Sequence, residues 1–259
     1  MSELTTVHWG FLVLGAIIMG LSKGGIPGAG NLTVALFVLV LEDALGPVGV
    51  GLSVGLLLPV LISADLVSTM VYRKYVEWSH VRRLLPYFLF GVLLGWWAFD
   101  FFQSAERARS LKVLIGGILL GITALRFLTH SSFQIKKKEP SNSPFFLGPF
   151  LGVLGGMATM LANAAGPIAQ FYLLVMKLPK YAFIGTSAWL FLIINLSKVP
   201  LMCELGILNR EIFDVSIWLF FPAVAGALIA PKIVQYIRQD WFERLIWFFI
   251  VIAGLRMII

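Results

Sequence analysis

A polar stretch rich in glycine and proline interrupts the first long apolar run of the chain. It reads Ser22-Lys23-Gly24-Gly25-Ile26-Pro27-Gly28-Ala29-Gly30-Asn31 and separates apolar residues 8–21 from apolar residues 32–41. A helix cannot continue through it, because Pro27 has no backbone N–H donor and glycine loses more conformational entropy than any other residue on ordering. In a membrane, such a break is tolerated only where other protein or a water-filled cavity satisfies its N–H and C=O groups. The stretch therefore predicts a broken helix beside a cavity, where the charge of Lys23 favours an anion.

The composition places the whole chain in a lipid bilayer. Of its 259 residues, 59% are hydrophobic and only 13% are charged, far from the soluble average. We therefore expect an all-α integral membrane protein. One cysteine and three histidines have no spacing typical of metal ligands, so neither a metal nor a cofactor is expected. The net charge of +7 lies mostly in short loops beside apolar spans, as the positive-inside rule requires, so nucleic acid is not an expected partner.

The apolar spans predict two similar halves. Residues 1–130 form the first transmembrane repeat, 131–144 a polar linker and 145–259 the second repeat. In the second half, a small-residue break at 162–167 again separates two apolar arms, and Gly185-Thr186-Ser187 matches Gly51-Leu52-Ser53. Each half is expected to contain a broken helical hairpin followed by three full spans. These spans are predicted at residues 46–64, 84–102 and 111–128, and then at 181–199, 213–231 and 241–259, with a polar, basic stretch at 65–83.

Helix length and charge both favour a hairpin at each break. The first broken element covers about 35 residues, or roughly 50 Å of helix, which is too long for one crossing of a core of about 30 Å, while each arm alone is short for a crossing. Apart from Lys23 and Lys198, the lysines and arginines divide 13 to 5 between the two faces if each element is a hairpin, and 10 to 8 if each crosses once. The first division fits the positive-inside rule. Three crossings per half then give two inverted repeats, cytoplasmic basic loops, both termini outside, and hairpins that meet near the midplane.

Charged residues inside or beside the spans have alternative interpretations. Lys198 could reach the membrane surface with its long side chain, but Asn195 lies three residues earlier on the same helix face, an arrangement that suits an oxyanion. Lys23 is the residue most expected to bind the anion, because its alternative role as an anchor at the membrane surface conflicts with its position at the tip of a hairpin. Asp65 and Glu204 could bind coupling protons, but both lie at predicted span ends, where a solvated carboxylate is the expected state.

Uncharged polar residues have alternatives as well. Asn163 could bind the anion or cap the helix that follows, where Pro167 fits the first turn. Thr186 and Ser187 could contact the anion or donate to carbonyl groups of their own helix, which is the commoner arrangement in membranes. Trp189 is expected to pack rather than to gate.

Two motifs resemble the TauE/SafE family of sulfite and organosulfonate exporters, also called the toluene sulfonate uptake permease family. The first is Gly20-Leu21-Ser22-Lys23-Gly24-Gly25-Ile26-Pro27-Gly28. The second is Ala162-Asn163-Ala164-Ala165-Gly166-Pro167, followed by Gly185-Thr186-Ser187-Ala188-Trp189 and by residues 195–200. The resemblance covers nearly the whole chain, although Val34 and Ala35 stand where the family often has a proline.

The resemblance implies a secondary transporter, not an enzyme, in the bacterial cytoplasmic (inner) membrane. It would export a small sulfur-containing anion, such as sulfite or sulfoacetate, by proton-coupled alternating access, with a homodimer as the expected assembly. A passive anion channel and a transporter of a non-sulfur organic anion are the alternatives. The expected substrate-binding residues surround the two breaks and the helix after the second: Ser22, Lys23, Gly24, Gly25, Asn31, Asn163, Thr186, Ser187, Trp189, Asn195 and Lys198.

Overall fold

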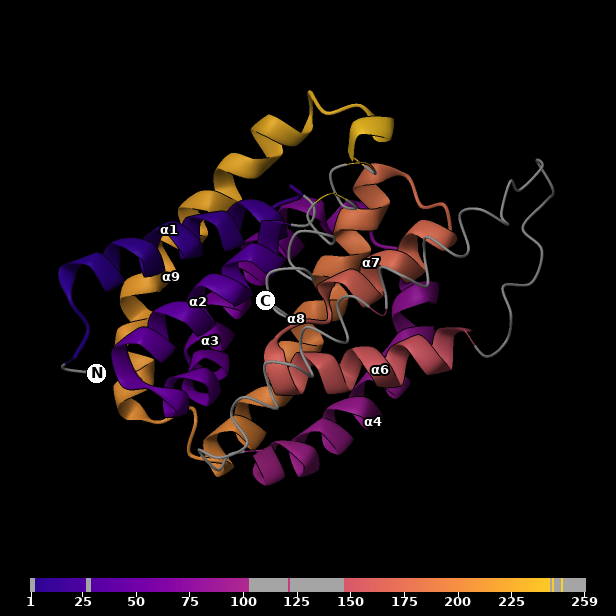
Figure 1. Cartoon of the computed structure of the whole chain (residues 1–259). Coiled ribbons are helices and arrows are strands. Elements are labelled where there is room, and N and C mark those ends of the chain that lie inside the picture. The colour runs from indigo at the N-terminus through magenta and orange to yellow at the C-terminus, as the bar shows by residue number, and fades with distance from the viewer. Residues whose placement is uncertain are drawn as a thin grey trace.

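A computed structural model describes residues 3–26, 29–102, 121, 147–242, 244 and 248, and this part of the chain is helical, without strands (Figure 1). In the first half, α1 (Thr6–Lys23), α2 (Ala29–Leu45) and α3 (Pro47–Tyr72) are followed by the short 3-10 helix η1 (Arg73–Tyr75) and by α4 (Trp78–Phe102). The second half contains α6 (Leu147–Ala162), α7 (Gly166–Val175), α8 (Lys180–Glu204) and α9 (Arg210–Val234). The predicted span at 111–128, the linker and most of 241–259 lie outside the described residues.

The first break separates α1 from α2 as predicted. Lys23 is the last residue of α1, and Gly25 follows with φ of 123°, a conformation that residues with a Cβ rarely adopt. The two helices then run antiparallel. Close to the turn, the Gly30 amide donates to Ser22 Oγ at 2.9 Å, and at the far end His8 Nε2 lies 3.0 Å from a carboxylate oxygen of Asp43. The predicted hairpin of the first half is therefore present, while its placement in the membrane stays a prediction.

The second break forms a shorter hairpin from α6 and α7. α6 ends at Ala162, Asn163 has a φ of 51°, and α7 begins with Pro167 in its first turn. Gly148, near the start of α6, faces the ring of Tyr172, near the end of α7, so these helices are also antiparallel. α7 has 10 residues and is about 15 Å long, which is half of what a membrane crossing needs.

Several helices are longer than predicted, and the longer α3 and α1 change the interpretation. α3 continues to Tyr72 through residues that were expected to belong to a polar stretch beginning at position 65. The hydroxyl groups of Ser63, Ser68 and Thr69 donate to carbonyl oxygens of α3 itself, so these polar residues do not end the helix. α1 has 18 residues and is about 27 Å long. It is therefore long enough to cross a membrane, whereas the arm predicted at residues 8–21 was short for a crossing.

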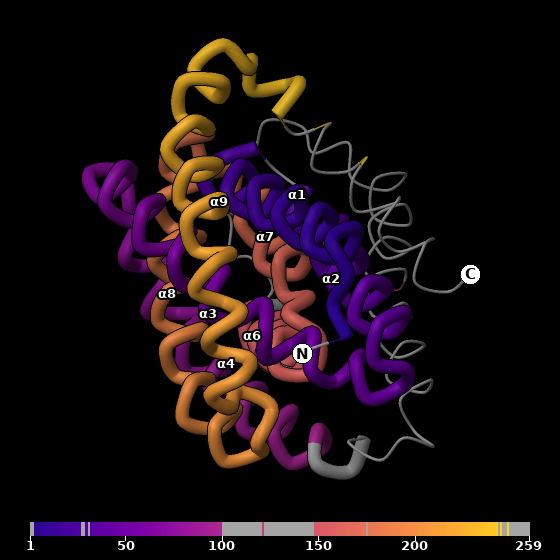
Figure 2. Tube along the Cα trace, turned by 90° about the vertical axis from the view of Figure 1, so that its left-hand side faces the viewer, coloured from indigo at the N-terminus to yellow at the C-terminus, as the bar shows by residue number. Residues whose placement is uncertain are grey.

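The two halves exchange packing partners. α1 packs along α9, a helix of the second half, and α6 packs along α4, a helix of the first half (Figures 1 and 2). α3 and α8, the long helices that follow the two hairpins, contact each other. This reciprocal packing favours the prediction of two related repeats, whereas their inverted orientation stays a prediction.

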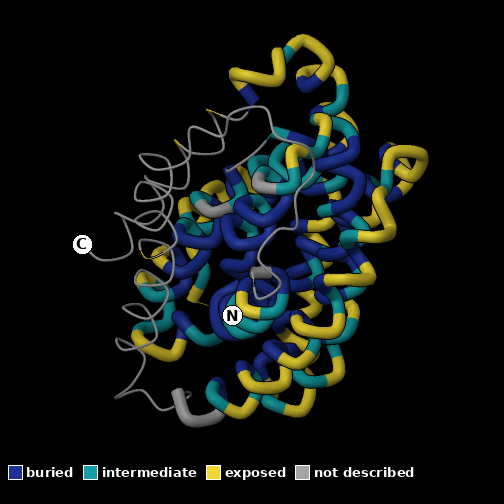
Figure 3. The backbone as a smooth tube through the Cα atoms, turned by 90° about the vertical axis from the view of Figure 1, so that its right-hand side faces the viewer, coloured by how far each residue is buried: buried dark blue, intermediate teal, exposed yellow. Residues whose placement is uncertain are grey.

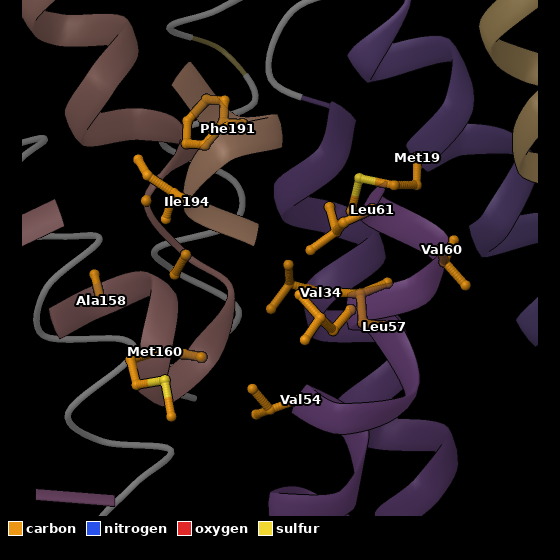
Figure 4. Packing of buried hydrophobic residues seen from close by; sticks show 14 of the residues in the cluster. Met19, Val34, Val54, Leu57, Val60, Leu61, Ala158, Met160, Phe191 and Ile194 are labelled. Atoms are coloured by element: carbon orange, nitrogen blue, oxygen red, sulfur yellow. The ribbon is translucent and has the colours of Figure 1, made fainter. Parts of the chain in front are cut away.

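Apolar side chains fill the interior and also cover much of the outer surface. Residues from α1, α2 and α3 face residues from α6 and α8 across the core (Figure 4). Exposed residues lie mainly on the outside of the bundle (Figure 3), and large apolar ones among them include Phe11, Met70, Trp97, Trp218 and Phe221. Four segments of the described chain are long and apolar enough to cross a membrane: Thr6–Lys23, Pro47–Tyr75, Lys180–Glu204 and Arg210–Val234. The architecture is therefore that of an α-helical membrane protein.

Gly20 allows α1 and α9 to pack backbone against backbone. A Cβ at this position would overlap the carbonyl oxygen of Ala223. We expect Gly20→Val to destabilise the protein by about 1–3 kcal/mol, because α9 must move away from α1. Gly10→Val is the matched control, since nothing lies within 4 Å of a Cβ at Gly10 in the same helix. Thermal unfolding in detergent measures both variants, and equal midpoints would contradict the role of Gly20.

Candidate functional site

A cavity of about 70 Å³ lies between the two helix breaks and α8. This volume is several times the roughly 10–15 Å³ that one water molecule requires, so a small anion fits. Gly30 and Gly166, in the first turns of α2 and α7, both line it. The positive ends of two helix dipoles therefore lie at the cavity and favour negative charge there. Its polar lining residues are Ser22, Lys23, Thr159, Asn163, Gln170, Ser187 and Asn195.

Lys23 forms an ion pair with Asp65 beside this cavity. Lys23 Nζ lies 2.9 Å from Asp65 Oδ1 and 3.2 Å from Oδ2. The Asp65 side chain is completely buried, and Asn195 Nδ2 donates to its Oδ2 at 2.8 Å. Lys23 Nζ also lies 4.2 Å from the ring centroid of Phe191, within the range of a cation–π interaction. The expectation that Asp65 is solvated was wrong, because α3 continues past it and places it in the protein interior.

Lys198 is the second buried lysine of the site. Its Nζ donates to the carbonyl oxygen of Thr159 at 2.8 Å, to Thr159 Oγ1 at 3.3 Å and to Asn163 Oδ1. These three acceptors match the three protons of an ammonium group. Lys198 has no exposed surface, so the alternative that it reaches the membrane surface was wrong. All three acceptors are neutral oxygen atoms.

Asn163 connects the second break to both long helices. Its Nδ2 donates to the carbonyl oxygen of Val54 in α3 at 2.8 Å, while its Oδ1 accepts from Lys198 in α8. Asparagine is among the residues that tolerate its positive φ. The alternative that Asn163 caps α7 was wrong, because Ala165 is the N-cap residue of that helix and forms no side-chain cap.

The structure brings most of the predicted binding residues to one place. Six of them line the cavity: Ser22, Lys23, Gly25, Asn163, Ser187 and Asn195. Lys198 lies one hydrogen bond behind this lining. Ser187 also donates to the Ile184 carbonyl of its own helix, as one of its two interpretations required. The side chain of Asn31 lies outside the described residues.

Three other predicted residues have different contacts. The Gly24 carbonyl accepts from the hydroxyl of Tyr72 at 2.8 Å. Thr186 Oγ1 accepts from the Glu77 amide at 2.9 Å, and this contact connects α8 to the segment before α4. The Trp189 ring packs 5.2 Å from that of Trp78, which agrees with its expected packing role. None of the three lines the described cavity.

Sequence reasoning missed two residues of the site and placed a third in the wrong surroundings. Thr159 and Gln170 flank the second break and line the cavity, and Asp65 forms the ion pair behind it. Apart from Asp65 itself, residues 60–72 are all apolar or carry a hydroxyl group, and this was the signal that could have placed Asp65 inside a helix. Gln170 Oε1 and Asn195 Oδ1 are buried, and neither accepts a hydrogen bond from the described residues. No three His, Cys, Asp or Glu side chains in the described ranges could hold a metal ion.

Comparison with known proteins gives one family. The model of the family described as Sulfite exporter TauE/SafE matches residues 12–257. Comparison with curated proteins and with solved structures gave no match. The matched range contains both breaks and all the residues of the cavity.

Replacing Asn163 tests its two contributions separately. We expect Asn163→Ala to lower the free energy of unfolding by about 1–3 kcal/mol, because Lys198 loses an acceptor and alanine is strained at positive φ. Asn163→Gly removes the same hydrogen bonds but relieves the backbone strain, so its loss should be smaller. Thermal or denaturant unfolding of the purified variants measures both. Wild-type stability of the alanine variant would contradict this account of the break.

Proposed function

The chain belongs to the Sulfite exporter TauE/SafE family, and on this premise we propose that it exports a small sulfur-containing anion, sulfite or an organosulfonate such as sulfoacetate. The family match confirms the resemblance seen in the two motifs. Members of this family are transporters, and the long apolar helices suit a transport protein of the membrane. The identity of the anion, the coupling and the mechanism are the proposed part.

The observation that carries the proposal is the charge of the cavity region. Lys23 lines it and pairs with the buried carboxylate of Asp65, while Lys198 lies one hydrogen bond behind the lining, at Asn163. The ammonium group of Lys23 and the first turns of α2 and α7 give the cavity a positive character that favours an anion. A sulfonate offers three acceptor oxygens to donors such as Lys23 and the hydroxyl groups of Ser22 and Ser187.

The transport mechanism we propose is alternating access. The anion binds between the two helix breaks near the membrane midplane, and one repeat moves against the other around it. Reciprocal packing of the hairpins supports two such bodies. The proposal further places the protein in the bacterial cytoplasmic membrane as a homodimer of inverted repeats, with basic loops cytoplasmic and both termini outside. Proton coupling is also proposed, and the buried carboxylate at the site supports it.

Anion binding can be measured by thermal shift, since a ligand of the native state stabilises it. The panel is sulfite, thiosulfate, sulfoacetate, isethionate, taurine, sulfate, lactate and chloride. We expect sulfite or one sulfonate to raise the unfolding midpoint most, equivalent to about 2.7 kcal/mol at 100 times Kd. Stabilisation by lactate alone, or by none of these anions, would overturn the proposed substrate class.

Two lysine variants test whether the anion binds at the cavity. Lys23→Gln should lose most of the anion-dependent shift, because the ammonium group that lines the cavity is gone. Its midpoint without added anion also falls, since Asp65 loses its partner, so the readout is the shift on adding anion. Lys74→Gln, at an exposed position of η1, is the matched control and should keep the wild-type shift. Equal shifts in the two variants would remove Lys23 from the site.

Flux in proteoliposomes separates a transporter from a channel. We expect uptake of the stabilising anion to saturate with its concentration and to respond to an imposed pH gradient, because each cycle binds a limited number of ions. Linear, non-saturating flux that ignores the pH gradient would favour a passive anion channel. Saturable flux of a carboxylate in place of a sulfur anion would favour the other alternative.

A further inference from the structure

We propose that Asp65 competes with the transported anion for Lys23, and that a proton binds to Asp65 when the anion takes its place. The inference rests on the proposed function and names the proton-binding residue of the same site. It also sets the sign of the coupling: the proton and the anion bind together and move in the same direction, so the outward gradient of the anion is what drives export.

The competition follows from where the three charges lie. Lys23 both lines the cavity and contacts Asp65, whereas Asp65 and Lys198 are fully buried behind the cavity surface. An anion that reaches Lys23 Nζ therefore meets an ammonium group that already has both carboxylate oxygens within 3.2 Å. Two negative groups so close together in an apolar interior repel strongly, as in carboxylate pairs that share one proton. Binding at full strength requires one of the two charges to disappear.

One proton completes the exchange. The carboxylate of Asp65 takes up a proton to become a neutral carboxyl group, the ammonium of Lys23 keeps all its protons, and the anion replaces Asp65 as its ionic partner. One positive and one negative charge enter together, so the net charge of the site does not change.

Asn195 can form a hydrogen bond with Asp65 in its ionised and in its protonated form. Its Nδ2 donates to the Asp65 carboxylate, while its Oδ1 is buried and accepts nothing from the described residues. A carboxyl group has an O–H to donate, and the same amide can accept it after turning by half a rotation. The unpaired Oδ1 therefore has a use when Asp65 is protonated, which a purely structural ion pair would not explain.

The positive charges around Asp65 oppose its protonation. Lys23 faces it from α1 and Lys198 acts on it from α8, and both lysines favour the carboxylate. Other helices that contact α3 carry their titratable residues near their ends: Glu42 and Asp43 in α2, and Arg210, Glu211, Asp214 and Lys232 in α9. A bound anion offsets the charge of Lys23, and this removes the main obstacle to protonation. The anion and the proton thus promote each other's binding, as linkage requires.

The test measures how affinity depends on pH. Isethionate is a suitable probe, because it stays a monoanion across the neutral pH range. Proton uptake on binding means that affinity rises as pH falls, by up to about tenfold per pH unit for one proton. Titration calorimetry of the wild-type protein in two buffers of different ionisation enthalpy counts the protons directly, and we expect uptake of about one.

Asp65→Asn is the decisive variant, and Asp43→Asn its matched control. The asparagine variant cannot compete for Lys23 or take up a proton, so its affinity should be independent of pH and about tenfold tighter than wild type at high pH. Asp43 also pairs with a basic residue, His8, but at an exposed position. Its variant should keep the wild-type pH dependence and proton uptake.

Each outcome decides between the two proposals. Anion binding without proton uptake in the wild-type protein would overturn this inference and leave the proposed function intact. A pH dependence that persists in Asp65→Asn would place the proton elsewhere and also overturn it. If Asp65→Asn does not fold, the wild-type proton count alone decides. Failure of every sulfur anion to bind the wild-type protein would overturn the proposed function itself.

Discussion

Burial of Asp65 is the constraint on which the rest of the site depends. Moving a carboxylate out of water costs several kcal/mol unless an opposite charge and further hydrogen bonds compensate it. Lys23 supplies the charge and Asn195 the hydrogen bond. These partners come from α1 and α8. The turn of the first hairpin therefore has to meet α3, at Asp65, and α8 at one point. The break after Lys23 is what lets α1 end there.

The second hairpin also places a polar residue against a residue of the long helix that follows it, but there the long helix, not the hairpin, carries the lysine. In the first half, the hairpin provides a cation and the long helix that follows provides a carboxylate. In the second half, the hairpin provides the Asn163 amide and the long helix provides Lys198. Similar elements thus meet in similar ways, but only one of the two lysines receives an ionic partner from the described residues.

The features that local chemistry determines could be predicted from the sequence. Glycine and proline end helices wherever they cluster, so both breaks and the arms around them were predictable. Lys23 and Asn163 followed from their positions at the breaks, and Asn195 from its position three residues before Lys198. Asp65 was expected to be solvated, because hydrophobicity marks where a span becomes polar but not whether a neighbouring helix covers it. The contacts of Thr186 and Ser187 diverge because successive helical residues point about 100° apart. Which of them faces the cavity depends on how α8 is rotated, and packing against α3 and α4 sets that rotation.

Reciprocal packing also bears on how the protein is assembled during synthesis. The α6–α7 hairpin emerges from the ribosome after α4, so the surface on which α6 packs is already in the membrane when it arrives. The α1–α2 hairpin is made first, yet α1 packs along α9, which begins at residue 210. The face of α1 that contains Gly20 therefore has no partner in α9 until most of the chain has been inserted. Insertion of α9 is therefore the step that encloses the first hairpin, and the ion-paired end of α1 reaches its final surroundings only then.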